Sequence, residues 1–352
     1  MDKLKQIFAN RWVKFSLAVI IYTLWFVVWT GNLWWLLGLI VIFDVYVTKF
    51  ITGRLSKINE QFKAKSKLYR TIEEWVSAII FATVVASVIH IFIFQMYVIP
   101  SSSMEKTMLV GDYLYVSKLT YGPQMPNTPL AFPFVHHTMP FSTTKKSFSE
   151  AISRPYKRLA GRGSVERGDI VVFNYPAGDV ATTNPEVIDV HTMCYAFGME
   201  LNPQLQGVDT LSAAEAYPLY KEIYNDGLEY IKSHPGEFGK LLHRPVDRRE
   251  NYVKRCVALP GDTFEIHNGY NRVRGYEGVL GNEEGQRILL HLLSEENPSK
   301  EKLLQGGFPD DERVGWNIGE FGPLYIPKEG SRVDMTVENA LVYRKAIEWE
   351  QR

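Results

Sequence analysis

Apolar residues are concentrated near the amino-terminal end of the chain, in three almost uninterrupted runs. Residues 12–30 form a run of the ~20-residue length that a membrane-spanning helix requires. Residues 33–47 follow after the short Gly31-Asn32 connection, which favours a helical hairpin, although this run is shorter and contains Asp44. Residues 75–98 form the clearest run. The pattern therefore predicts three transmembrane helices.

The basic residues predict how these helices are oriented. Lysine and arginine accumulate in cytoplasmic segments next to membrane spans. Here residues 1–74 hold a basic amino terminus, the helical hairpin and a basic loop, which places both basic segments in the cytoplasm. Residues 75–98 then cross the plasma (inner) membrane outward, and residues 99–352 form a domain on the extracytoplasmic side. The basic residues concerned are Lys3, Lys5, Arg11, Lys14, Lys49, Arg54, Lys57, Lys63, Lys65, Lys67 and Arg70.

Two ionisable residues interrupt the apolar runs, where such groups are costly and often functional. We expect Asp44 to lie near the cytoplasmic end of its helix and His90 to form a hydrogen bond between helices. Both therefore have a structural interpretation.

The pattern changes from helical to extended in the exported part. Residues 112–118, 169–174, 251–259 and 263–266 are rich in aromatic and β-branched residues, and they have the length of strands. Pro260-Gly261-Asp262 predicts a turn between the last two strands, because proline fixes φ and glycine tolerates a positive φ.

Longer polar stretches separate these strands. Residues 121–164 are rich in Pro, Gly, Ser and Thr, and predict an irregular connection. An insertion at about 176–249 contains a helical pattern over 212–233, which Pro218 and Gly227 should limit. A second helix-prone stretch covers 282–305. The predicted fold is a set of amino-terminal transmembrane helices followed by a mainly-β, antiparallel-sheet domain with α-rich insertions.

Charge and cysteine content exclude several kinds of site. The chain has 39 basic and 39 acidic residues, so no net charge favours binding to nucleic acid. The two cysteines, Cys194 and Cys256, lack a zinc-binding pattern, and the sequence does not settle whether they pair. No metal or cofactor is indicated.

Ser103 lies just beyond the third apolar run, and Lys254 lies in a predicted strand. A serine hydroxyl becomes a nucleophile when a base accepts its proton, and burial favours the neutral amine that lysine needs for this role. The apolar neighbours of Lys254 suggest such burial. A solvated lysine beside Arg255 is the structural alternative.

Three short segments, at residues 99–104, 167–173 and 252–262, resemble the conserved boxes of type I signal peptidases. Residues 99–104 (IPSSSM), followed by Gly111-Asp112, are similar to the serine box. Residues 167–173 (RGDIVVF) are similar to the strand that contains Arg-Gly-Asp, and residues 252–262 (YVKRCVALPGD) to the lysine box. Their order behind a membrane anchor makes the resemblance specific, although the boxes cover a small part of the chain.

The resemblance implies a reaction and a site. It makes Ser103 the nucleophile and Lys254 the general base, with the Ser101 hydroxyl and the Ser103 amide as oxyanion donors. It implies signal peptides of exported preproteins, with small residues at the −1 and −3 positions, as substrates. The lipid bilayer is a second partner, and the protein-export machinery is a compatible third. The substrate cleft maps to Ile99, Pro100, Met104, Met108, Tyr252 and Val253, whose strand edges would pair with an extended peptide.

The sequence also departs from the family pattern. Ser102 stands where the family usually has glycine, and the last box, Gly-Asp-Asn-Arg, is absent. Because that box supplies strands and a serine that holds the lysine, two interpretations remain. The sequence is a truncated form of an active enzyme, or it is an inactive relative that serves as a membrane-anchored binding or assembly protein.

A different serine hydrolase is the other enzymatic alternative. Residues 103–106 match Ser-x-x-Lys, the nucleophile motif of penicillin-binding proteins. The Lys-Thr-Gly motif of that class is absent, and Pro100 favours an extended context. Replacing Lys106 and Lys254 separately distinguishes the two classes.

Overall fold

The computed structural model describes residues 10–142, 145–184, 186–187, 189–205, 207–208, 211, 213–294, 296–305, 307–309 and 311–350. The chain divides into two compact units. The helical unit consists of residues 1–95, 117–125 and 155–163. The sheet unit consists of residues 96–116, 126–154 and 164–352.

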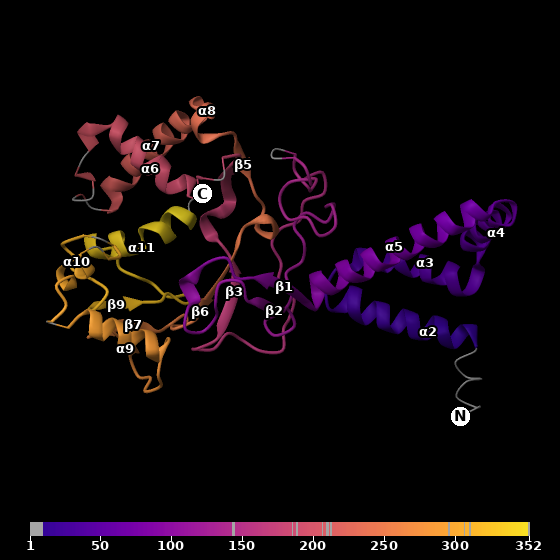
Figure 1. Ribbon diagram of the computed structural model, residues 1–352, viewed down its shortest axis with the longest axis horizontal. Coiled ribbons are helices and arrows are strands. Elements are labelled where there is room, and N and C mark those ends of the chain that lie inside the picture. The colour runs from indigo at the N-terminus through magenta and orange to yellow at the C-terminus, as the bar shows by residue number, and fades with distance from the viewer. Residues whose placement is uncertain are drawn as a thin grey trace. The chain divides into compact units, whose positions relative to one another are not determined.

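The helical unit is built from the apolar runs (Figure 1). α2 lies against α3, and α4 lies against α5. The elements are α2 (Arg11–Tyr22), η1 (Thr23–Val28), η2 (Leu33–Leu37), α3 (Gly38–Phe43), η3 (Asp44–Thr48), α4 (Phe50–Lys65) and α5 (Lys67–Phe92).

Two helices, Arg11–Val28 and Lys67–Phe92, are long and apolar enough to cross a membrane. Leu33–Thr48 and Phe50–Lys65, which are bent by 63° relative to each other, pass the same test only when they are taken together, as a broken span or a re-entrant segment. The predicted helix over 75–98 is wrong at its end, because Phe94–Val98 form strand β1. Those residues pair with strand β2 (Tyr113–Ser117), and backbone pairing overrides their apolar character.

Two segments from later in the chain pack against helices of the helical unit. Phe92, Met125 and Leu159 are buried together, and Trp29 packs beside them. The indole nitrogen of Trp29 donates a hydrogen bond of 3.1 Å to the carbonyl oxygen of Ala160. Segments 117–125 and 155–163 therefore belong to the helical unit.

The sheet unit contains short strands in several small sheets. Within the described residues, β1 pairs with β2, β3 with β6, and β4 with β5, while β7 lies between β8 and β9. The β3–β6, β4–β5, β7–β8 and β7–β9 pairs are all antiparallel. The remaining strands are β3 (Ile170–Asn174), β4 (Val180–Thr182), β5 (Leu241–His243), β6 (Asn251–Arg255), β7 (Thr263–His267), β8 (Tyr270–Val273) and β9 (Phe321–Tyr325).

Helices and short helical turns connect these strands. They are η4 (Ser102–Met104), η5 (Pro176–Asp179), α6 (Val190–Leu201), η6 (Pro203–Leu205), α7 (Ala213–Ser233), α8 (Pro235–Phe238), η8 (Val246–Arg248), α9 (Glu283–Leu292), α10 (Lys300–Leu304) and α11 (Val337–Glu350).

The expected strands over 112–118, 169–174 and 263–266 are present as β2, β3 and β7, and that over 251–259 is present only in its first part, because β6 ends at Arg255. The turn that follows β6 has Gly261 at φ +98°, a conformation that glycine adopts without strain. The prediction of a mainly-β domain is not confirmed, because more of the described residues lie in helices than in strands. The strands are short, whereas the insertion and the later connections form helices.

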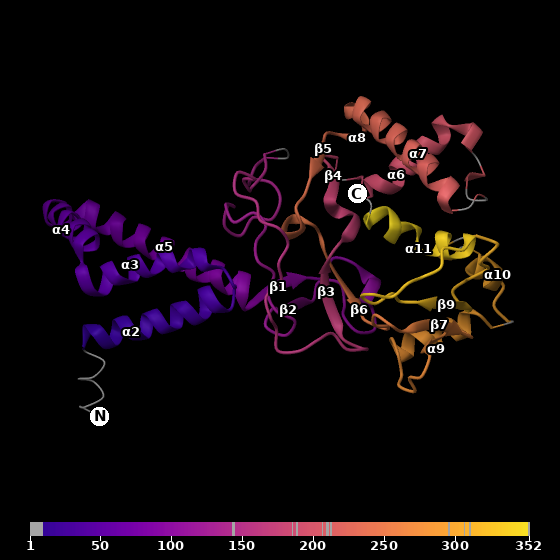
Figure 2. The same cartoon turned by 180° about the vertical axis from the view of Figure 1, so that it is seen from behind.

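The insertion forms a helical hairpin that strands β4 and β5 bracket. Figures 1 and 2 show α6 beside α7. Cys194 of α6 and Ile231 of α7 are buried in one core cluster. The prediction that Pro218 and Gly227 limit the helix is wrong, since α7 continues through both. A Cβ atom at Gly227 would lie 1.8 Å from the carbonyl oxygen of Cys194. Glycine is therefore used here for close helix packing.

Candidate active site

Ser103 lies on a short helical turn directly after β1. The amide of Ile99 donates to the carbonyl of Asp112 at 3.0 Å, and the amide of Gly111 donates to the carbonyl of Ile99 at 2.9 Å. The chain then turns through η4, in which the Met104 side chain is buried while Ser103 remains exposed. The buried Ile99 and Met104 side chains on either side of Ser103 fix this turn.

Lys254 approaches Ser103 from strand β6. β6 lies beside β3 (Figure 2). The two strands are antiparallel, and Val171 is opposite Lys254. The Nζ atom of Lys254 donates a hydrogen bond to Oγ of Ser103, a contact across 151 positions of the sequence. The fold thus brings together the two residues that the sequence singled out.

The expected burial of Lys254 is wrong, because its side chain is exposed. Alternate residues of a strand point to opposite faces. Val253 and Arg255 on either side of Lys254 are half-buried, and Lys254 points outward between them. In the described part of the chain β6 has only β3 as a strand partner, so its other edge is unpaired.

Arg255 links the strand of the lysine to the loop that follows the serine. Its guanidinium donates to the carbonyl of Gly168 at 3.0 Å and to Oγ1 of Thr107 at 3.0 Å. Thr107 also accepts a hydrogen bond of 3.2 Å from the side-chain amide of Asn282. Sequence reasoning gave Arg255 no role, because its partners lie far away in the sequence.

A second arginine joins the segment before β3 to the turn after β6. Arg167 forms a two-pronged ion pair with Asp262, at 2.8 Å from Nε and 2.5 Å from the terminal nitrogen. This contact holds the pKa of the Asp262 carboxyl below its usual range and raises the pKa of Arg167. Asp262 also accepts a hydrogen bond of 2.7 Å from the amide of Leu259, and this contact within the turn stabilises it further.

The residues expected to bind substrate surround the serine unevenly. Met108, Tyr252 and Val253 are half-buried, whereas Pro100 and Ser101 are exposed. Both backbone groups of Ile99 are paired, which leaves none for the expected pairing with a peptide at that residue.

The free edge of β6 is better suited to such pairing. The carbonyl of Glu250 accepts a hydrogen bond from the amide of Tyr175, and the amide of Cys256 donates to the carbonyl of Asp169. Backbone groups in an antiparallel strand alternate in direction. The amide and carbonyl of Val253 therefore point away from β3.

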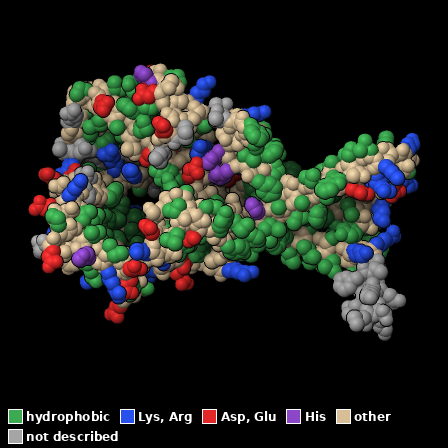
Figure 3. Space-filling model, in the orientation of Figure 1, with side chains coloured by type: hydrophobic (Ala, Val, Ile, Leu, Met, Phe, Trp, Pro, Cys, Tyr) green, Lys and Arg blue, Asp and Glu red, His purple; other side chains and the backbone are tan. Residues whose placement is uncertain are grey.

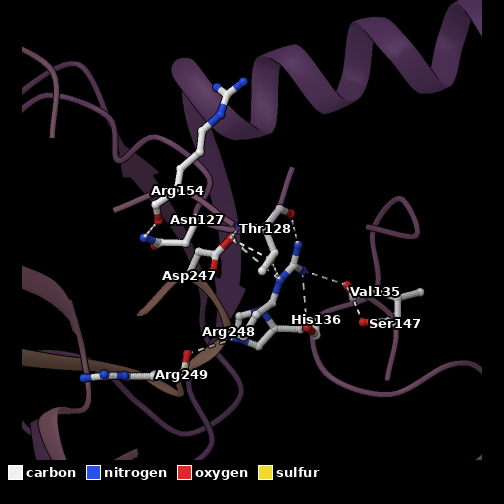
Figure 4. Close-up of polar contacts among 9 residues, drawn as sticks. All are labelled: Asn127, Thr128, Val135, His136, Ser147, Arg154, Asp247, Arg248 and Arg249. Carbon is white, nitrogen blue, oxygen red and sulfur yellow. Dashed lines mark hydrogen bonds and ion pairs between the residues drawn. The ribbon is translucent and has the colours of Figure 1, made fainter. Parts of the chain in front are cut away.

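A buried polar cluster holds the segment that leads into β6 (Figure 4). Oδ2 of Asp247 accepts hydrogen bonds of 3.0 Å from both the amide and the hydroxyl of Thr128. Arg248 donates to the Thr128 hydroxyl at 3.0 Å and to the carbonyls of Val135 and His136 at 3.3 Å each. The irregular loop before β3 is thereby attached to the start of the lysine strand.

Neither cysteine forms a disulfide. Cys194 is buried in the core that α6 and α7 share, and the thiol of Cys256 donates to the carbonyl of Ala258. Among the described residues no group of three or more His, Cys, Asp or Glu side chains is arranged to hold a metal ion.

Comparison with known proteins places this site within a family. The family model described as "Signal peptidase, peptidase S26" matches residues 72–283, a range that contains Ser103, Arg167, Lys254 and Asp262. No solved structure matches the chain significantly.

Curated relatives carry the same description. Signal peptidase I of Haemophilus influenzae is 36% identical over 209 residues, which cover 59% of this chain and 46% of that protein. Signal peptidase I of Rickettsia typhi is 30% identical over 32% of this chain and 35% of its own length. Signal peptidase I P of Bacillus subtilis subsp. natto is 31% identical over 24% of this chain and 34% of its own length.

The chain thus spans less than half the length of each of these relatives. The matched range nevertheless covers more than half of this chain and includes the contact between Ser103 and Lys254. The chain belongs to the signal peptidase, peptidase S26, family.

Proposed function

We propose that this protein is a membrane-bound serine endopeptidase that removes amino-terminal signal peptides from exported preproteins. The observation that carries the proposal is the hydrogen bond from Lys254 Nζ to Ser103 Oγ, inside the range that matches the family. A nucleophile within hydrogen-bond reach of its base is the arrangement that acyl transfer requires.

The reaction follows from these two groups. Lys254 accepts the proton of Ser103 as Oγ attacks the scissile carbonyl. The Ser101 hydroxyl and the Ser103 amide stabilise the oxyanion of the tetrahedral intermediate. Lys254 then gives the proton to the leaving amine, and water hydrolyses the acyl-enzyme with Lys254 again as the base.

Substrate binding completes the site in this proposal. An extended peptide pairs with the free edge of β6 at Val253, where the described residues leave the backbone amide and carbonyl pointing outward. The bound peptide covers the exposed Lys254 and excludes water, which favours the neutral amine that a base requires. Ile99, Pro100, Met104, Met108 and Tyr252 line the adjoining cleft, which accepts small side chains at the −1 and −3 positions.

The proposed location is the plasma membrane, with several spans. The helix Lys67–Phe92 is followed after nine residues by Ser102, the first residue of the turn that carries Ser103. Since basic residues lie before the first apolar run and between the second and third, the amino terminus is cytoplasmic and Ser103 faces the outside. The bilayer and the protein-export machinery are then the partners that deliver the substrate.

The test is the cleavage of a preprotein with an Ala-x-Ala site by the full chain in lipid nanodiscs. We expect cleavage after the second alanine, established from the mass of the released mature protein. Ser103→Ala should lower the rate by at least about 10³-fold. No cleavage by the parent chain, at any concentration that binds the preprotein, would favour the membrane-anchored binding protein instead.

The penicillin-binding alternative receives no support from the position of Lys106. Its side chain pairs with Glu284, with 3.3 Å between Nζ and Oε1. Lys254 is the lysine that contacts the serine hydroxyl.

A further inference from the structure

The helix α4 differs in character from the apolar helices on either side of it. Ile51, Leu55, Ile58 and Phe62 recur at the spacing that forms one stripe along a helix. All four are at least half exposed, with values between 52% and 61%. An exposed apolar stripe of this regularity requires a partner.

Basic residues border this stripe. Arg54 lies four positions before Ile58, and Lys65 lies three positions after Phe62, so both are next to the stripe on the helix surface. Lys57 is also exposed. Among the described residues no carboxylate forms a salt bridge with Arg54, Lys57 or Lys65. Figure 3 shows lysine and arginine side chains gathered around α4.

Asp44 sets the direction of α4. Its carboxylate accepts hydrogen bonds from the amides of Phe50 at 2.7 Å, Ile51 at 3.1 Å and Thr52 at 2.9 Å. The Asp44 carboxylate therefore caps the first turn of α4. Between Asp44 and α4 the helical segments bend by 63°, and Lys49 at the bend has a left-handed backbone conformation. This cap agrees with the structural interpretation of Asp44. The bend directs α4 away from the axis of the preceding helix.

The other end of α4 is tied to the start of α5. Ser66 alone separates the two helices and caps α5 through the amide of Tyr69 at 3.2 Å. Lys63 forms an ion pair of 2.6 Å with Glu73, and Asn59 donates to Glu73 at 2.9 Å. One face of α4 thus packs on α5, while the apolar stripe remains open.

We propose that α4 is an interfacial helix that binds an anionic phospholipid surface. The stripe enters the boundary between headgroups and acyl chains, and Arg54, Lys57 and Lys65 contact lipid phosphates. We assign an anionic lipid surface as the partner for two reasons. The basic side chains of α4 complement its charge, and helices with apolar runs precede and follow α4 after one residue each, so α4 is continuous with segments suited to a membrane. The proposal does not depend on the chemistry of Ser103.

Spin labels on the full chain test this placement. Cysteines are introduced at Ile58 or Glu60 in a Cys194→Ser, Cys256→Ser chain, which is reconstituted in nanodiscs of phosphatidylcholine with or without phosphatidylglycerol. With phosphatidylglycerol, we expect the Ile58 label to be protected from a water-soluble nickel relaxant and the Glu60 label to be exposed to it. Protection of both labels would show a span, and exposure of both would show a solvated helix; either result overturns the proposal.

The lipid preference is tested with charge variants. Each of Arg54→Gln, Lys57→Gln and Lys65→Gln should lower the ratio of protected to exposed Ile58 label about fivefold in anionic nanodiscs. Lys63→Gln is the matched control, because Lys63 already pairs with Glu73, and it should leave the ratio unchanged. Equal protection in the presence and absence of phosphatidylglycerol would also contradict the proposal.

Discussion

Arg255 has the position of a residue that aligns the serine with the lysine. It lies next to Lys254 on β6. Its guanidinium donates hydrogen bonds to the carbonyl of Gly168 and to the hydroxyl of Thr107, and Thr107 lies four residues after Ser103. A misplacement of about 1 Å between reacting groups can cost about 100-fold in rate. We therefore expect Arg255 to act by positioning the Ser103 and Lys254 side chains.

We predict that Arg255→Ala lowers kcat about 10- to 100-fold with little change in KM. The measurement is steady-state preprotein cleavage by the chain in nanodiscs. Arg274→Ala is the control, because Arg274 is exposed and pairs with Glu265 instead. An unchanged kcat for Arg255→Ala would show that this residue does not align the site.

His137 makes the sheet unit sensitive to acid. Burial lowers the pKa of His137 to about 3, with further lowering from His136 and Arg244. An unfolded histidine has a pKa of ~6.5, so below that value the unfolded chain binds a proton that the folded chain does not. The free energy of unfolding should therefore fall as the pH decreases from ~6.5, by up to about 1.4 kcal/mol per pH unit.

Urea unfolding between pH 7.5 and 5 in detergent checks this expectation. His137→Gln should flatten the dependence on pH, whereas His291→Gln, at an exposed position, should not. The same slope in the parent chain and in His137→Gln would contradict the assignment.

The sequence identified Ser103 and Lys254 but not the environment of the lysine. Apolar neighbours along one strand indicate burial only if both faces of that strand are covered, and the Lys254 side chain is exposed. Arg255 and Thr107 were missed for a related reason, since contacts between distant segments leave no local pattern. Their roles required the pairing of β3 with β6 and the turn at η4.

At the scale of elements, close packing in the insertion depends on small residues. α6 and α7 cross where Gly227 meets the backbone of Cys194 and where Gly198 meets that of Ile223. Any side chain at these positions would separate the helices.

Gly227→Ala should lower the free energy of unfolding by about 1–3 kcal/mol, because its Cβ would lie 1.8 Å from the carbonyl oxygen of Cys194. Gly236→Ala is the control, since no described atom lies within 4 Å of a Cβ there. Thermal unfolding followed by circular dichroism gives the comparison. Equal melting temperatures for both variants would show that the helices adjust without cost.

Element positions were predictable where one local signal dominates. Segments of strand length rich in aromatic and β-branched residues located β2, β3, β6 and β7, and the long apolar runs located α2 and α5. The prediction failed where tertiary contacts decide. α7 continues through Gly227 because its neighbour requires a glycine there, and residues 94–98 form a strand because β2 pairs with them.

At the scale of the whole molecule, the chain combines apolar helices with a sheet unit that carries the serine and the lysine. The family match extends from residue 72 to residue 283, so it includes most of α5 as well as β3 and β6. Helical content exceeds the sequence-based expectation because the insertion and the connections after β8 fold as helices. These segments contain no strand pattern, and the prediction of a mainly-β domain underestimated how many of their residues form helices.

The comparison of Lys254→Ala with Lys106→Ala tests the central claim most directly. Both lysines are exposed and lie in the sheet unit, but only Lys254 donates a hydrogen bond to Ser103 among the described residues. We predict that Lys254→Ala slows preprotein cleavage by at least about 10³-fold and that Lys106→Ala stays within about threefold of the parent chain. Full activity in Lys254→Ala, or loss of activity in Lys106→Ala alone, would contradict the account.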